Sequence, residues 1–477
     1  MSIDPRHEQL NEGDLVRTTP SRHEVLNKTV LSWAAWDWGS AAFNAVATTF
    51  VFSVYLTSGL FGNSDQATSA LGVGLAIAGF IIALLAPITG QRADRRGKGT
   101  FWLGVNTFIV VGLTAAMFFV RPESPLGPAG ALWLGIALLG LGNIFFEFAS
   151  VNYNAMLGRI SAPHNMGRIS GLGWGAGYVG GIVLLLILFV GFIHPEVGWF
   201  GVTGEDGLNI RVAMLLAAAW FGLSAIPVLF AVRGRAFETP QADDQHESIV
   251  TSYKLLWRTV KRLWNESPNI IHFLIASAIF RDGLAGVFTF GAVIAAGTFG
   301  FSKSEVLIFG VAANVVAGVA TIGFGALDDK FGPKAVILLS LVSMVLAGGA
   351  VFVFHNGGSK VFWVFGLILC IFVGPAQSAS RSFLARIIPA GREGEVFGLY
   401  ATTGRAVSFL APAMTALFIE LGKHVVDEGQ SAQYWGILGI ALILLAGLVL
   451  MLRVKSHSEQ ITSFDDHPDE DVPVLGK

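Results

Sequence analysis

Uninterrupted apolar runs of about 20 residues recur along this chain, and they leave few folds open to it, because about 20 helical residues cross a hydrocarbon core. Twelve runs are present, near residues 32–58, 67–90, 100–120, 130–155, 169–193, 209–232, 269–298, 304–327, 334–354, 361–384, 394–420 and 432–453. Only 13% of the 477 residues are charged, whereas soluble domains carry roughly 25%. The sequence therefore predicts an all-α integral membrane protein with twelve transmembrane helices.

Lysine and arginine residues are concentrated in alternate connections, and this bias sets the expected orientation. They crowd the segment before the first run, the turn after the second run and the central segment, 233–267. Because positive residues stay on the cytoplasmic side, both termini are expected in the cytoplasm and the protein in the cell membrane, inner or plasma. Residues 1–31 lack the apolar core of a signal peptide, so we predict an uncleaved cytoplasmic tail.

A charged turn follows the second apolar run and returns 235 residues later. The first copy is GQRADRRGKG, residues 90–99, and the second is GALDDKFGPK, residues 325–334. The matching positions are Gly90 with Gly325, Asp94 with Asp329, Arg95 with Lys330, and Gly97 with Gly332. A second pair, LGRI at 157–160 and LARI at 384–387, supports two pseudo-symmetric six-helix bundles, 32–232 and 268–453.

The two turns predict contacts that change during a conformational cycle. Asp94 and Asp329 lie at the ends of helices, where a carboxylate can dock on the positive N-terminus of a facing helix. Such contacts can break and reform as the two halves rock. The alternative is that the turns only determine topology, and both interpretations can hold together.

The central segment carries the pattern of a basic amphipathic helix. Its apolar side holds Ile249, Tyr253, Leu256, Trp257, Val260 and Trp264, and its other side holds Lys254, Arg258, Lys261 and Arg262. We expect this helix to lie on the inner leaflet; a solvated linker helix is the alternative. Residues 454–477 are acidic and contain two prolines, so a disordered tail is expected there.

The layout and the duplicated turn resemble the major facilitator superfamily. Within it, WAAWDWGSAAFN at 33–44 resembles the signature of the vacuole-effluxer-like family, whose yeast member is an amino-acid effluxer. NYNAMLGRI, GLGWGAGYVGG, FRDG (280–283) and QSASRSFLARIIP (377–389) resemble the later blocks of that family. The resemblance implies the major facilitator fold, alternating access and amino acids as the leading substrate class.

Polar and charged residues inside the apolar runs are the candidates for a substrate or ion site, because a charge in the membrane is costly unless it is paired or faces water. The candidates are Asp37, Asn44, Glu147, Arg281, Asp282 and Arg405. Arg405 is expected to pair with Glu147 or Asp282, or to hold a substrate carboxylate. Either Asp282 or Glu147 is the candidate proton carrier. A purely structural ion pair is the alternative for Asp37 and for Glu147.

Other residues in the runs have structural interpretations. Trp33, Trp36 and Trp38 are expected to anchor the first helix at the membrane interface, and Arg381 to serve packing or gating. The GxGxxG of residues 175–180 lies inside an apolar run and not after a strand. We therefore expect these glycines to allow close helix packing and not to bind a nucleotide.

The sequence contains no Walker loop, no GxSxG, no HExxH and no Cys/His cluster, so neither an enzyme, nor a cofactor, nor a metal site is expected. A net charge of −2 gives no indication of nucleic-acid binding. We expect a monomeric secondary transporter of a small molecule, with protons as the candidate coupling ion. The alternatives are an exporter of amphipathic drugs or metabolites, which predicts an aromatic, uncharged cavity, and a transporter-like receptor or scaffold that does not transport.

Overall fold

The computed structural model describes residues 25–231, 249–301, 303–389, 391–426 and 432–456. Most of the expected tail at 1–31, the start of the central segment and almost all of the acidic tail lie outside these residues. The described chain is helical apart from one isolated β-bridge between Val197 and Thr203. It contains 12 helices long and apolar enough to cross a membrane, which confirms the all-α prediction.

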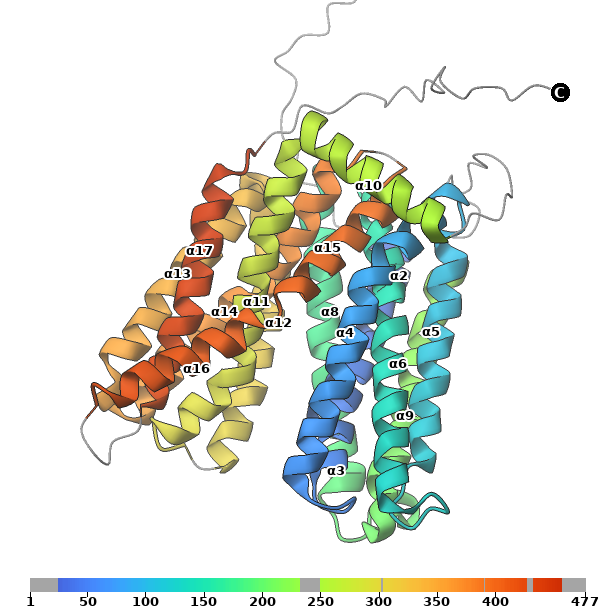
Figure 1. Cartoon of the computed structure of the whole chain (residues 1–477), viewed down its shortest axis with the longest axis vertical. Helices are drawn as coiled ribbons and strands as arrows, with labels where there is room; N and C mark the ends of the chain where they lie inside the picture. The colour runs from blue at the N-terminus through green and yellow to red at the C-terminus, as the bar shows by residue number, and fades with distance from the viewer. Residues whose placement is uncertain (1–24, 232–248, 302, 390, 427–431, 457–477) are drawn as a thin grey trace, which may run out of the picture.

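The first six spans form the N-terminal bundle, drawn from blue to green in Figure 1. Their elements are α2 (Lys28–Ala41) with the π-helix η1 (Ala42–Phe50) and α3 (Phe52–Thr57), then α4 (Ser64–Arg95), α5 (Gly99–Ala116), α6 (Gly127–Ala155) with the short α7 (Leu157–Ile160), α8 (Met166–Leu188) with η3 (Phe189–Ile193), and α9 (Leu208–Ala231). The first span begins at a cap, because the Asn27 side chain accepts a hydrogen bond of 2.9 Å from the Val30 backbone.

A separate helix precedes the second group of spans. It is α10 (Ile249–Glu266), and it crosses the top of the molecule in Figure 1. The following elements are α11 (Pro268–Gly297), α12 (Lys303–Phe331), α13 (Pro333–Val353), α14 (Ser359–Ile387), α15 (Glu393–Val407), α16 (Leu410–Lys423) and α17 (Gly436–Arg453). The end of the molecule at which α10 lies is called the α10 face below.

The predicted span at 394–420 is confirmed as Glu393–Lys423, but it is not one continuous helix. Within it, α15 ends at Val407 and α16 begins at Leu410. A buried carboxylate from another helix holds this break, as described with the site below.

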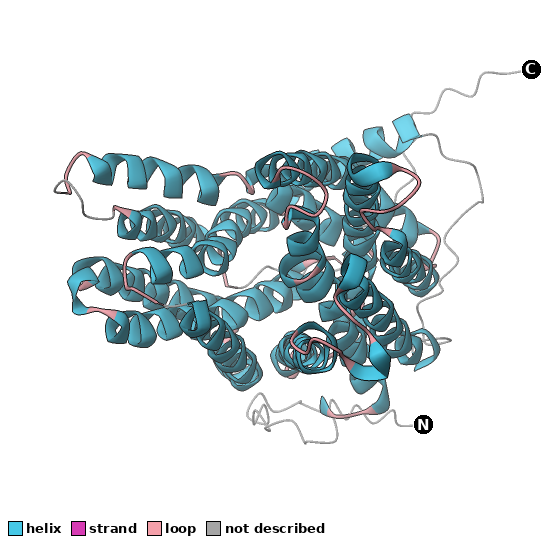
Figure 2. Cartoon of the chain, turned by 90° about the horizontal axis from the view of Figure 1, so that it is seen from below, coloured by secondary structure: helices cyan, strands magenta, loops and turns pink. Residues whose placement is uncertain are grey.

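Each bundle has its own apolar core. The largest fully buried side chains in the N-terminal core include Trp33, Trp36, Phe43, Phe52, Tyr153 and Phe221, and those in the C-terminal core include Phe273, Phe280, Phe383 and Phe397. The C-terminal core also extends onto Ile82, Ile144 and Val151 of α4 and α6, so apolar packing continues across the seam between the bundles. Figure 2 views the molecule from the side opposite α10.

The bundles contact each other closely at the α10 face, where α4 packs on α15 and α8 packs on α12. A Cβ added to Gly90 would lie 2.0 Å from the carbonyl oxygen of Gly394, and one added to Gly325 would lie 2.7 Å from that of Gly167. The small side chain is what permits these approaches. The duplicated glycines thus close the seam between the bundles at this face.

Candidate functional site

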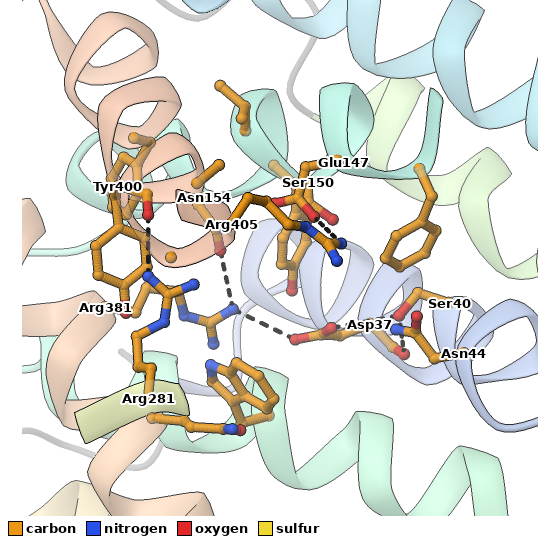
Figure 3. A pocket seen from close by; sticks show the side chains of 18 of the residues that line it. Asp37, Ser40, Asn44, Glu147, Ser150, Asn154, Arg281, Arg381, Tyr400 and Arg405 are labelled. Atoms are coloured by element: carbon orange, nitrogen blue, oxygen red, sulfur yellow. Dashed lines mark hydrogen bonds and ion pairs between the residues drawn. The ribbon is translucent and has the colours of Figure 1, made fainter. Parts of the chain in front are cut away.

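A cavity of about 370 Å³ lies between the two bundles. Its charged walls come from both halves: Asp37, Glu147, Arg281, Asp282, Arg381 and Arg405 all line it. Asn44 lines it too, so the structure brings all six predicted substrate or ion residues to one place (Figure 3). Three carboxylates and three guanidinium groups therefore share one cavity, which is not the uncharged chamber that the drug-exporter alternative predicts.

Glu147 and Arg405 form an ion pair across the seam. Arg405 Nη2, from α15, lies 3.1 Å from Glu147 Oε2, from α6. Their side chains are 38% and 20% exposed, so the pair faces the cavity and not a core. Of the two partners expected for Arg405, the structure selects Glu147. Because each bundle supplies one charge, the pair must lengthen or break if the bundles separate here.

A second ion pair across the seam joins Asp37 of α2 to Arg381 of α14, with Arg381 Nη1 3.4 Å from Asp37 Oδ2. Arg381 also donates hydrogen bonds of 2.6 Å to the Ser170 carbonyl and 3.0 Å to the Ser170 hydroxyl. The guanidinium carbon lies 4.8 Å from the ring centre of Trp33, and the side chain is 4% exposed. The Arg381 side chain of the C-terminal bundle is therefore buried between α2 and α8 of the N-terminal bundle and links the two bundles.

The tryptophans of the first span have a different role from the one predicted. Trp33 and Trp36 are 0% and 1% exposed, so the prediction of interfacial anchors is wrong for both. They stack on Tyr153, with ring centres 4.4 Å and 4.3 Å apart, and their indole N–H groups donate to the Tyr153 carbonyl and the Thr107 hydroxyl. A buried indole with a satisfied N–H stabilises a core, and both indoles belong to the N-terminal core.

Asp282 holds the break in the eleventh span. Its Oδ2 accepts a hydrogen bond of 2.6 Å from the backbone N–H of Ala411, in the first turn of α16. The first N–H groups of a helix have no partner within the helix, and a carboxylate there also opposes the positive end of the helix dipole. The residue is 7% exposed. The carboxylate is thus engaged by the backbone of α16, although it borders the cavity.

Arg281 precedes Asp282 and has a different environment. It donates a hydrogen bond of 3.1 Å to the Tyr400 carbonyl, and its guanidinium carbon lies 3.7 Å from the Tyr400 ring centre. Among the residues that the structure describes, no carboxylate lies within 4.0 Å of its charged nitrogens. Arg281 is therefore a cavity cation held by a ring and a carbonyl, with a charge that no acidic side chain in the described chain neutralises.

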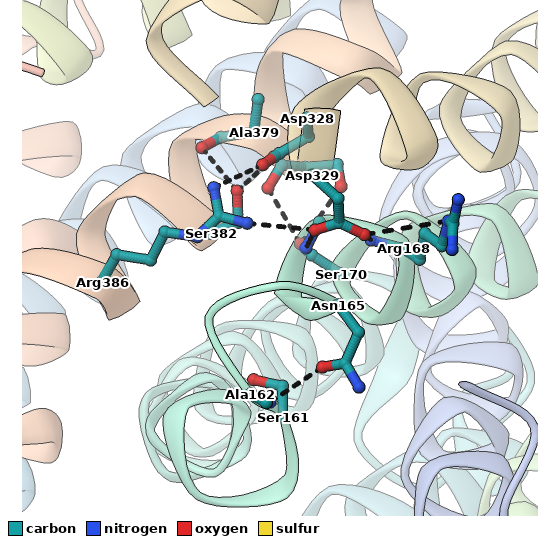
Figure 4. Close-up of polar contacts among 12 residues, drawn as sticks. Ser161, Ala162, Asn165, Arg168, Ser170, Asp328, Asp329, Ala379, Ser382 and Arg386 are labelled. Carbon is teal, nitrogen blue, oxygen red and sulfur yellow. Dashed lines mark hydrogen bonds and ion pairs between the residues drawn. The ribbon is translucent and has the colours of Figure 1, made fainter. Parts of the chain in front are cut away.

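The predicted docking of the turn aspartates is confirmed. Asp94 Oδ2 accepts a hydrogen bond of 2.9 Å from the Glu395 backbone, in the first turn of α15. Asp329 accepts bonds of 2.7 Å and 3.1 Å from the Gly167 and Arg168 backbones, in the first turn of α8 (Figure 4). Both contacts cross the seam. Each repeat therefore places a carboxylate on the N-terminus of a helix from the opposite bundle.

Arginines from the other repeated pair, LGRI and LARI, add ion pairs to these contacts. Arg159, from LGRI, lies 3.8 Å from Asp94 and 3.0 Å from Glu393, and Arg386, from LARI, lies 3.1 Å from Asp329. Of the other matching positions in the two turns, Gly97 and Gly332 adopt φ of 60° and 85°, which favours glycine. Lys330 contacts the neighbouring Phe331 ring at 5.1 Å, and the Arg95 side chain is exposed.

Several residues of these networks were not predicted as candidates. Asp328 accepts hydrogen bonds from Ser382 and, at 2.6 Å, from Arg386 (Figure 4). Glu395 is 3% exposed and accepts a hydrogen bond of 2.8 Å from Gln91. Asp328 directly precedes Asp329, which the repeat identifies. The two consecutive aspartates in GALDDKFGPK could therefore have indicated Asp328 as a candidate. Glu395 follows a helix start by two residues, and nothing in the sequence distinguishes it from a surface glutamate.

The glycine run of the fifth span has the packing role that was expected. A Cβ on Gly173 would lie 2.9 Å from Arg381 Nη2 and 2.7 Å from the Trp33 ring. A Cβ on Gly180 would lie 2.3 Å from the Trp38 carbonyl oxygen. The run thus lets α8 pack against α2 and leaves room for the buried arginine.

Comparisons with known proteins agree with this architecture. Among solved structures, the fold is similar to that of a bacterial homologue of the iron transporter ferroportin in an outward-facing state, with a TM-score of 0.67, 16% identity, and coverage of 92% of this chain and 100% of that one. It is also similar to the proton:xylose symporter XylE, with a TM-score of 0.64, 14% identity, and coverage of 90% and 95%. At these identities the likeness concerns the fold alone.

Curated relatives are closer in sequence. The uncharacterized MFS-type transporter YxiO of Bacillus subtilis is 25% identical over 447 residues, which covers 93% of this chain and 98% of that protein. Autophagy-related protein 22-1 of Neosartorya fischeri is 24% identical over 308 residues, 60% of this chain, and this stretch spans about half (48%) of the fungal protein. The family described as vacuole effluxer Atg22 like matches residues 57–461. The chain therefore belongs to the Atg22-like vacuole effluxer family of the major facilitator superfamily, and it is a multi-pass secondary transporter and not an enzyme.

Proposed function

We propose that this protein carries amino acids across the cell membrane by alternating access, with the α10 face in the cytoplasm. The observation that supports the substrate class is the charge arrangement of the cavity. An amino acid presents a carboxylate and an ammonium group together, and the walls offer both guanidinium and carboxylate partners. A substrate carboxylate binds Arg281, because a planar guanidinium matches a carboxylate and this one has no acidic neighbour within 4.0 Å in the described chain.

Glu147 is the best candidate for the ammonium partner and for proton coupling. It faces the cavity, and its present partner is a side chain of the opposite bundle that must move during the cycle. Protonation of Glu147, or its occupation by the substrate ammonium, would release Arg405 and loosen the seam. Asp282 is less suited to this role, because its carboxylate already accepts the α16 backbone hydrogen bond.

Alternating access follows from the contacts at the two ends of the cavity. In this structure the α10 face is closed by the Asp94 and Asp329 docks and by the glycine approaches. Opening that face requires both docks to break and the apolar contacts of α4 and α6 with the C-terminal bundle to separate. The cavity charges then become accessible from the cytoplasm, which is the expected second state of the cycle.

The substrate test uses purified protein in liposomes. Uptake and counterflow are measured over a panel of amino acids, their decarboxylated amines and uncharged amphipathic compounds, with and without a pH gradient. We expect counterflow of at least one amino acid and none of its decarboxylated amine. Transport of the amphipathic compounds alone would favour the drug-exporter alternative, and the absence of counterflow for every compound would favour the receptor alternative.

The orientation test uses single cysteines in a Cys370→Ala background. Lys98, at the start of α5, is exposed at the α10 face, and Glu123 is exposed in the connection at the other end. In intact cells, Glu123→Cys should react with an impermeant maleimide and Lys98→Cys should not. The reverse pattern would invert the proposed topology.

A further inference from the structure

Helix α10 joins the two bundles at the closed face. Its buried side consists of Ser252, Leu256, Thr259 and Leu263, which recur at helical spacing. Arg92, from α4 of the N-terminal bundle, donates a hydrogen bond of 3.2 Å to Ser252. Arg392, just before α15 of the C-terminal bundle, donates one of 3.1 Å to Thr259. The helix is therefore attached to both sides of the seam at once.

These attachments lie beside the Asp94 dock. Arg392 is 3.5 Å from Glu395, and the backbone of Glu395 donates to Asp94. Tyr253 adds a hydrogen bond of 2.9 Å to the carbonyl of Leu84 on α4. Separation of α4 from α15 would have to break or rearrange the contacts of α10 with one of them. The position of α10 is thus coupled to the closed state of the α10 face.

The opposite side of α10 is exposed and combines positive charge with large aromatic rings. Trp257 and Trp264 are 70% and 59% exposed and lie two turns apart, so they share one side. Lys254, Arg258 and Lys261 are also exposed. Only Ser267 separates the end of α10 from α11, which crosses the membrane. The helix therefore lies at the level where lipid headgroups meet water.

This combination fits a negatively charged lipid surface better than a protein or nucleic-acid partner. Tryptophan is favoured at the headgroup level, and basic side chains there are attracted to anionic lipids. We propose that the exposed side of α10 binds anionic phospholipid headgroups, and that this binding stabilises the state in which the α10 face is closed. The inference does not depend on which substrate the cavity carries.

The test measures how often the α10 face opens in membranes of defined composition. Ser378, on α14, is 3% exposed, and its hydroxyl donates a hydrogen bond of 3.1 Å across the seam to the hydroxyl of Ser170 on α8. In a Cys370→Ala background, Ser378→Cys should react with a water-soluble maleimide only when the seam opens. The full chain is placed in nanodiscs of phosphatidylcholine alone or with phosphatidylglycerol, and no substrate is added.

We expect phosphatidylglycerol to slow labelling by about fivefold or more, the lower end of typical coupling between two sites. The triple variant Lys254→Gln, Arg258→Gln, Lys261→Gln should label at the wild-type rate in neutral discs and lose the lipid effect. Lys360→Gln, which removes an exposed charge at the other end of the molecule, should keep it. Equal labelling in both lipids, or an undiminished lipid effect in the triple variant, would overturn the proposal.

Discussion

The closed α10 face and the cavity behind it differ in their symmetry. The face consists of two equivalent sets of contacts, one from each repeat, whereas the cavity does not. At the face, Asp94 and Asp329 bind the first turns of α15 and α8, with Arg159 and Arg386 beside them. In the cavity, the repeat offset of 227 residues pairs Arg381 with Asn154, Arg405 with Tyr178 and Glu147 with Gly374. At this offset these three charged residues therefore have no charged counterparts in the other half.

This difference indicates a division of labour between the two regions. Both bundles must grip and release at the α10 face, so equivalent contacts suit both halves. A small asymmetric solute touches each half differently, so the cavity walls need not match. Changes in the cavity should therefore alter which solute binds and how tightly, whereas changes at the face should alter how fast the transporter turns over.

The largest effect is expected in the cavity, at Arg281. Arg281→Gln should weaken binding of a transported amino acid about 100-fold, because one partner of a charge pair is removed in a partly desolvated site. Arg281→Lys keeps the charge but loses the planar fork, so it should recover only part of the affinity. Half-saturation of counterflow provides the measurement. Wild-type affinity in Arg281→Gln would remove Arg281 from the substrate site.

The next effect concerns the two docks. Asp94→Asn and Asp329→Asn should each slow turnover about tenfold while half-saturation changes less than about twofold, because each loses a charge at a helix N-terminus. The similar size of the two effects is the sharper expectation, since the docks are repeats of each other. Initial rates at saturating substrate measure both. A loss of affinity without a loss of rate would move these residues into the site and end the division proposed above.

The repeated glycines allow a graded comparison. Gly90→Ala should keep the α10 face from closing more than Gly325→Ala does, because its Cβ would meet a carbonyl oxygen at 2.0 Å and not at 2.7 Å. Gly112→Ala is the matched control, since no atom lies within 4 Å of its Cβ position. Labelling of Ser378→Cys should be fastest in Gly90→Ala. An identical rate in all three variants would show that these approaches do not set closure.

The smallest effect is expected for Asp282→Asn. The asparagine carbonyl can still accept the Ala411 hydrogen bond, so gradient-driven uptake should stay within about twofold of wild type. Asp282→Ala leaves the first turn of α16 without its partner and should destabilise the protein by about 1 kcal/mol, the usual cost of a lost cap. Thermal unfolding in detergent measures the second effect. Loss of gradient-driven uptake in Asp282→Asn would instead return this residue to the proton pathway.

Much of this structure could be predicted because it depends on local chemistry. The twelve spans follow from apolar runs, and the docks follow from carboxylates at duplicated helix ends. The break after Val407 could not be predicted, since the partner of Ala411 lies 129 residues earlier in the chain. The burial of Trp33 and Trp36 was also missed, because an aromatic residue near a span end has the same sequence pattern whether it faces lipid or the core.

The cavity was predicted as a set of residues but not as a set of pairs. Charged residues within a membrane span can be recognised as candidates because burying a charge in the membrane costs free energy. This argument identified Asp37, Glu147, Arg281, Asp282 and Arg405. Cost does not say which helix supplies each partner, and Asp282 proved to face a backbone N–H and not a cation. Partner choice depends on how two bundles are joined, which no local pattern records.

The break between α15 and α16 also has a mechanical consequence. A continuous helix is stiff, so a push at one end would tilt the whole span. Here the segment next to the cavity carries Arg405 and packs on α4, while the far segment packs on α11 and α17. The joint at Ser408 and Phe409 lets the first segment follow the solute while the second stays with its own bundle. The span thus consists of two helical segments that can tilt separately about the joint, and the hydrogen bond from Ala411 to Asp282 holds the start of the second segment.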